Sequence, residues 1–108
     1  MLISKKAIYK WYIENNTPIV EITQKSSNIT FRLKAKDFLT LLNTGVSERV
    51  QLIEGTLIEI NFNLKSKHLY MNGSDINTSL TDPLFLDALK RELANLINST
   101  YEEEGAPW

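Results

Sequence analysis

The stretch ITFRLKAKDFLTLLNTG, from Ile29 to Gly45, decides the fold class because its hydrophobic period changes in the middle. In its first six residues apolar and polar side chains alternate, which predicts a β-strand with one buried face. After that, Phe38, Leu41 and Leu42 recur at intervals of three and four residues, which predicts a short helix. Gly45 stands where a residue in the left-handed conformation would end that helix. Strand and helix therefore follow each other directly in this chain.

Alternating patterns on both sides of this stretch predict further strands. The expected strands cover residues 7–14, 19–25, 29–34, 49–55, 56–64 and 67–71, with a short return strand through Ile76 left open. Short turns between them favour antiparallel pairing. In the first strand Tyr9 and Trp11 share one face and Tyr12 lies on the other, and a shift of one residue would exchange these faces. The pattern alone leaves open which aromatic residues are exposed.

A longer helix is predicted at the C-terminal end. Asp82 can accept hydrogen bonds from the free N–H groups of a helix start, and Pro83 suits the first helical position. Leucines then recur at three- and four-residue spacing. The expected fold class is α+β, in the order β-β-β-α-β-β-β-α. It consists of one mostly antiparallel sheet of about six strands, with a short middle helix and a longer C-terminal helix packed on one face.

The length and composition predict one domain, covering residues 1–100, followed by an acidic tail at 101–108. The N-terminus lacks the continuous apolar segment of a secretory signal, and no stretch approaches the roughly 20 apolar residues that span a bilayer. We therefore expect a cytoplasmic protein without a membrane partner.

Catalytic equipment is sparse in this sequence. There is no cysteine and one histidine, His68, which we expect to be a surface residue. A metal site built on cysteine or several histidines is excluded, and no phosphate-binding glycine loop is present. We therefore expect no enzyme activity, no metal site and no cofactor.

Charge is distributed unevenly along the chain. Residues 1–36 carry seven basic and two acidic side chains, whereas residues 37–108 carry five basic and eleven acidic ones. The strands of the basic half place Lys10, Tyr12, Arg32 and Lys34 on one predicted sheet face. Lysine and arginine pair with phosphates, and bases stack on exposed aromatic rings, so this face is a candidate single-stranded nucleic-acid surface. The competing interpretation is the ordinary solvated face of a half-buried sheet.

The tail YEEEGAPW, from Tyr101 to Trp108, combines an acidic run with an aromatic tip. Its candidate partner-binding residues are Glu102, Glu103, Glu104, Pro107 and Trp108. The tail resembles the C-terminal tip of bacterial and phage single-stranded-DNA-binding proteins, in which an acidic run precedes an apolar end that docks on partner proteins. The resemblance covers eight residues and departs from that family in its tip, which is Trp rather than Phe. Independently of the family, Trp is a frequent hot-spot residue and the glutamates favour a basic partner surface.

Two functional hypotheses follow from these observations. The first is a small non-enzymatic protein-binding module that acts by occluding a larger partner, as a phage- or mobile-element-encoded inhibitor or an immunity-type protein does. The alternative is a single-stranded nucleic-acid-binding protein with an acidic C-terminal tail. Exposed strand edges also leave a homodimer open.

Overall fold

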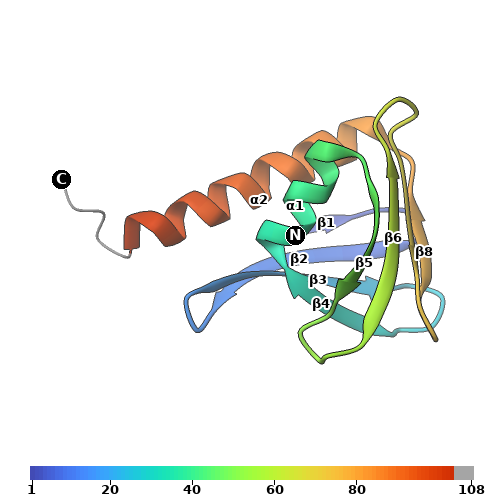
Figure 1. The fold of residues 1–108 in the computed structure, drawn as a ribbon, viewed down its shortest axis with the longest axis horizontal. Helices are drawn as coiled ribbons and strands as arrows, with labels where there is room; N and C mark the ends of the chain where they lie inside the picture. Colours follow the sequence, from blue (N-terminus) through green and yellow to red (C-terminus); the bar gives the residue numbers. More distant parts are fainter. Residues whose placement is uncertain (104–108) are drawn as a thin grey trace.

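A computed structural model describes the backbone of residues 1–103 and the side chains of residues 1–100. It contains eight strands and two helices within these residues, in the order seen in Figure 1. The elements are β1 (Leu2–Ile3), β2 (Ala7–Glu14), β3 (Thr17–Gln24), β4 (Thr30–Lys34), α1 (Ala35–Thr44), β5 (Ser47–Gln51), β6 (Leu57–Asn63), β7 (His68–Asn72), β8 (Asn77–Leu80) and α2 (Pro83–Glu103). The α+β class, the antiparallel pairing and both helices agree with the sequence-based prediction.

The strands form two sheets, whereas the sequence predicted one sheet of about six strands. Strands β1–β4 make a four-stranded antiparallel sheet and β5–β8 make another, each in sequence order. Helix α1 separates the two groups. Because each group has one apolar face, the groups can pack face to face across a common core as well as edge to edge, and period alone does not distinguish the two arrangements.

Both sheets and both helices enclose a single core. In Figure 1 the first sheet lies along the bottom, the second stands at the right, and α1 and α2 cover the remaining side. The helices pack on each other and on strands β2, β3 and β4. Phe31, Phe38, Ile60 and Leu89 are examples of fully or almost fully buried core residues drawn from both sheets and both helices. Burial of this apolar surface is the main stabilising contribution.

The two sheets are joined at two places. The N–H of Ile53, in the β5–β6 turn, donates to the carbonyl oxygen of Arg32 at 2.8 Å. The buried side chain of Gln24 accepts a hydrogen bond from the N–H of Asn77 and donates to the carbonyl oxygen of Asp75 at 3.2 Å. These hydrogen bonds satisfy polar groups that burial at the sheet junctions would otherwise leave unpaired.

The predicted ends of the helices are confirmed. Gly45 follows α1 with φ 67° and ψ 49°, and its N–H donates to the Leu41 carbonyl oxygen. At the start of α2, Asp82 Oδ1 accepts hydrogen bonds from the N–H groups of Leu84 (3.0 Å) and Phe85 (3.3 Å). In the turn before β3, Asn15 and Asn16 both have positive φ between β2 and β3. Such φ values suit a two-residue hairpin turn.

No helix of residues 1–103 is long and apolar enough to span a membrane.

Candidate functional site

The predicted nucleic-acid face exists as a face of the first sheet. Lys10 on β2 lies across from Glu21 on β3, which lies across from Arg32 on β4. In the neighbouring row of paired residues, Ile19 of β3 lies between Tyr12 of β2 and Lys34 of β4. The structure therefore brings Lys10, Tyr12, Arg32 and Lys34 together on the outer side of β2–β4. The intervening Glu21 places a carboxylate among them.

Arg32 and Tyr12 of this face are engaged with carboxylates. Arg32 Nε donates to Glu54 Oε1 at 3.0 Å, and Nη1 donates to Glu14 Oε2 at 3.3 Å. The Tyr12 hydroxyl donates to Glu21 Oε1 at 3.1 Å. The neighbouring Tyr12 side chain and the Glu54 carboxylate raise the pKa of the Arg32 guanidinium above its ordinary value. The positive charge of Arg32 is thus matched by carboxylates of this chain.

Burial shows which aromatic side chains of β2 face the core. Tyr9 is fully buried, its ring meets that of Phe85 edge to face at 5.3 Å, and Trp11 packs against the core. Tyr12 lies on the outer face and is half-buried. An aromatic residue therefore does lie on the outer face of the first sheet, but it is one ring already held by Glu21.

The predicted tail site lies mostly outside the described residues. Glu102 and Glu103 belong to the last turn of α2, although their side chains are not described. Glu104, Pro107 and Trp108 lie beyond the described residues. The tail therefore remains a prediction from sequence.

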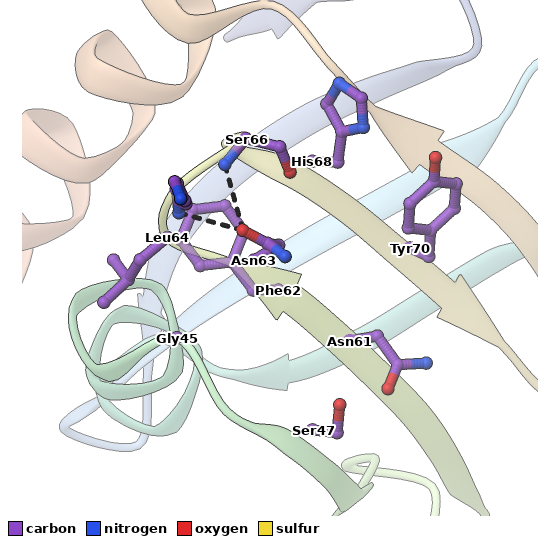
Figure 2. Close-up of a pocket in the computed structure, with 10 residues that line it drawn as sticks. Gly45, Ser47, Asn61, Phe62, Asn63, Leu64, Ser66, His68 and Tyr70 are labelled. Atoms are coloured by element: carbon purple, nitrogen blue, oxygen red, sulfur yellow. Dashed lines mark hydrogen bonds between the residues drawn. The ribbon is translucent and has the colours of Figure 1, made fainter.

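The outer face of the second sheet differs from that of the first. Ser47, Asn61, Tyr70 and Ser79 lie opposite one another across β5, β6, β7 and β8. Figure 2 shows the first three following each other across adjacent strands. Tyr70 is 45% exposed, and none of the four side chains has a hydrogen-bond partner within residues 1–100. This set of side chains, together with His68, is called the polar row below.

A hollow of about 650 Å³ opens along the polar row. Its lining residues are Gly45, Ser47, Asn61, Phe62, Asn63, Leu64, Lys65, Ser66, His68 and Tyr70. One wall forms where Leu64 packs over Gly45, so closely that an added Cβ at Gly45 would lie 2.3 Å from Leu64 Cγ. The positive φ and this contact together require glycine at position 45. The same residue that ends α1 therefore shapes the hollow.

The rim of the hollow is held by the turn between β6 and β7. Asn63 Oδ1 accepts hydrogen bonds from the N–H groups of Lys65 and Ser66, each at 2.9 Å (Figure 2). Lys67 has φ 59°, and its N–H donates to the Asn63 carbonyl oxygen at 2.7 Å. A turn fixed in this way loses little conformational freedom when a ligand binds, which favours binding.

The side chains that line the hollow include the aromatic rings of His68 and Tyr70. His68 meets the ring of Tyr70 edge to face at 6.2 Å and 80°. Activation of a serine or tyrosine needs a base in hydrogen-bond contact, and no such contact of His68 is present within residues 1–100. The same part of the chain contains no group of three or more metal-ligating side chains. Polar donors and acceptors, Lys65 among them, lie beside the exposed ring of Tyr70, an arrangement that suits binding of a polar surface.

Sequence reasoning placed Asn61 and Asn63 on a polar strand face but missed Tyr70 as a site residue. The available signal was the strand pattern itself, because outward, mostly polar residues alternate with buried apolar residues along β6 and β7. On the first sheet Lys10, Glu14, Arg32 and Lys34 lie in outward positions, and on the second sheet Arg49 and Glu59 lie across from each other on the same face as Asn61.

No protein-family model, curated protein or solved structure matches this chain.

Proposed function

We propose that the protein is a non-enzymatic protein-binding module that contacts its partner through the polar row on β5–β8. The observation that carries the proposal is that exposed Ser47, half-buried Asn61 and exposed Tyr70 form a row without hydrogen-bond partners among residues 1–100. Tyr supplies a large contact area at a low entropic cost, and Asn and Ser supply adaptable hydrogen bonds, as in antibody-type binding surfaces.

Exposed apolar side chains flank the polar row and support a protein partner. Leu57 on β6 is 55% exposed and Leu64 in the β6–β7 turn is 49% exposed. Single exposed leucines are common on protein surfaces. Here they lie at the two ends of the strand that carries Asn61 between them, and an interface typically surrounds its aromatic anchor with such contacts.

In this proposal the module acts by occlusion, as a phage- or mobile-element-encoded inhibitor or an immunity-type protein, because recognition is the chemistry that its exposed groups supply. The acidic tail, with Glu102, Glu103, Glu104, Pro107 and Trp108, provides a second contact to the same partner. The alternative, single-stranded nucleic-acid binding by Lys10, Tyr12, Arg32 and Lys34, receives less support because Glu14 and Glu54 already pair with Arg32.

The test is affinity capture from the cells that produce the protein, with and without nuclease. Tyr70→Ala combined with Asn61→Ala should abolish capture of a specific protein, whereas Tyr12→Ala on the other sheet serves as the matched control and should retain it. A third variant ending at Glu103 measures the contribution of the tail. Equal capture by the double variant and the wild type would refute the proposed surface. Capture that depends on intact nucleic acid would favour the alternative.

A further inference from the structure

A second hollow lies at the junction of the two sheets and has a different chemical character from the polar row. It has a volume of about 430 Å³. The residues that line it are Lys5, Lys6, Lys25, Ser26, Asn77 and Thr78. They come from the β1–β2 loop, the β3–β4 turn and the start of β8. A neighbouring hollow of about 340 Å³ shares Lys5 and Lys6 with it. This junction concentrates positive charge where three separate segments meet.

Backbone hydrogen bonds hold the lysine-bearing segments together. The N–H of Lys25 donates to the carbonyl oxygen of Lys6 at 3.0 Å, which ties the β3–β4 turn to the β1–β2 loop. The loop is closed on itself, since Ser4 Oγ donates to the Ala7 carbonyl oxygen at 2.8 Å and accepts from the Ala7 N–H at 3.1 Å. The positions of Lys6 and Lys25 are therefore set by the backbone and do not depend on a ligand.

The third segment is fixed by Gln24. Its buried side chain donates to Ser27 Oγ at 2.8 Å and to the Asp75 carbonyl oxygen, and it accepts from the Asn77 N–H. This set of hydrogen bonds brings the start of β8 against the end of β3. The side-chain amide of Asn77 is left exposed beside the lysines. The hollow thus has a preformed polar floor, which lowers the cost of ordering a ligand.

The positive charge of the junction is not neutralised by nearby carboxylates. Within residues 1–100 the ion pairs are those of Arg32, and none involves Lys5, Lys6 or Lys25. Asp82 lines the neighbouring hollow, but its Oδ1 accepts the N–H groups at the start of α2. This arrangement contrasts with the outer face of the first sheet, where the arginine is matched by glutamates.

A buried hydroxyl at the same place lacks a partner. Thr78 lines the hollow and is 3% exposed, and its Oγ1 has no hydrogen-bond partner within residues 1–100. An unsatisfied buried hydroxyl lowers the stability of a protein. A ligand that accepts a hydrogen bond from Thr78 Oγ1 would supply the missing partner.

We propose that this junction is a binding site for a small phosphate-class oxyanion, held by the ammonium groups of Lys5, Lys6 and Lys25. Ser26, Asn77 and Thr78 add neutral donors that can complete the coordination of the oxyanion. Charged hydrogen bonds to a phosphate are among the stronger polar contacts in proteins. The hollow has the size of a small-molecule site.

The test uses inorganic pyrophosphate, titrated calorimetrically at fixed ionic strength, with sodium chloride as the competing salt. Lys6→Gln combined with Lys25→Gln should weaken binding at least about tenfold, because each lysine contributes a charged hydrogen bond. The matched control, Lys36→Gln combined with Arg91→Gln, removes the same charge from exposed positions elsewhere. Equal losses in both pairs, or no binding by the wild-type protein, would overturn the proposed site.

A further variant distinguishes a specific binding site from a general attraction between the anion and the lysines. Thr78→Val keeps the shape of the side chain and removes its hydroxyl without changing the charge. It should weaken pyrophosphate binding several-fold while the folded protein becomes more stable. Unchanged binding would contradict a role for the hydroxyl. The capture of a protein partner should be unaffected by the lysine pair, so failure of this proposal is distinguishable from failure of the proposed function.

Discussion

The outer faces of the two sheets use their polar groups in opposite ways. On the β1–β4 face, Arg32 is paired with Glu14 and Glu54, and Tyr12 donates to Glu21. On the β5–β8 face, Ser47, Asn61 and Tyr70 lie in a row without such partners within residues 1–100. An arginine and a tyrosine that are already paired have less to offer a ligand, whereas unpaired groups around an exposed ring gain contacts on binding. This difference is the reason for which we propose the second sheet as the recognition surface.

The largest expected effect concerns the aromatic residue of each face. Tyr70→Ala should weaken partner binding by about 30-fold or more, the change that corresponds to about 2 kcal/mol for a hot-spot aromatic residue. Thermal unfolding should change little because the ring is substantially exposed. Tyr12→Ala should leave partner binding within about twofold of wild type. Measurement of both affinities with the captured partner checks the comparison, and a larger loss for Tyr12→Ala would reverse it.

The next effect concerns the wall of the hollow. Gly45→Ala should lower the free energy of unfolding by at least about 1–2 kcal/mol, because alanine disfavours the left-handed conformation. The new Cβ would also displace Leu64 and so alter the hollow. Chemical denaturation measures the stability. Asn43→Ala, at an exposed position of α1, is the control and should have a much smaller effect. An unchanged stability of Gly45→Ala would show that Gly45 is not required in its left-handed conformation.

A substitution at Tyr9, in the core behind the first sheet, is expected to raise the free energy of unfolding by a smaller amount. The Tyr9 hydroxyl is buried without a hydrogen-bond partner, so Tyr9→Phe should stabilise the protein by about 1 kcal/mol. The outer faces should be unaffected, and partner binding should stay the same. A loss of stability on this substitution would show that the hydroxyl has a partner in solution.

The same residue predicts a pH dependence. Burial raises the pKa of Tyr9 above its ordinary value of about 10, because the phenolate would lose its hydration. Above pH 10 the unfolded chain releases this proton while the folded protein retains it, so stability falls as pH rises. Below pH 10 both states are protonated and the contribution is constant. Unfolding free energies of wild type and Tyr9→Phe should therefore diverge above pH 10, and a constant difference would contradict the assignment.

The smallest effect is expected at the ion pairs of the first sheet. Arg32→Gln should lower the melting temperature slightly, because exposed ion pairs contribute little to stability. The loss should shrink at high salt, which screens such pairs. Arg49→Gln on the second sheet, where Arg49 has no ion pair within residues 1–100, should show no salt-dependent loss. Equal salt dependence of the two variants would show that the ion pairs of Arg32 do not distinguish the first sheet from the second.

Much of the fold could be predicted from the sequence because its signals are local. The change of period after Lys34, the cap at Asp82 and the helix end at Gly45 each depend on residues within a few positions. The division into two sheets depends on contacts such as those between Gln24 and Asn77, which lie 53 positions apart. Local patterns do not specify which apolar faces meet across a core.

The same reasoning explains the limits of the site prediction. Alternation correctly placed Lys10, Tyr12, Arg32 and Lys34 on one face. It did not show that Glu54, from a turn of the other sheet, would reach Arg32. An outward polar residue becomes available for binding only when no distant segment engages it. Tyr70 meets that condition and Arg32 does not, and the distinction requires the tertiary structure.

The central claim is that β5–β8 presents the recognition surface, and site-specific photo-crosslinking tests it most directly. A photoreactive phenylalanine analogue would replace Tyr70 in one protein and Tyr12 in another, which gives two matched aromatic positions on opposite sheets. In the producing cells, the analogue at position 70 should form a discrete adduct with one protein, and Asn61→Ala should reduce that adduct. The analogue at position 12 should form none. An adduct at position 12 alone, or equal adducts at both positions, would contradict the account.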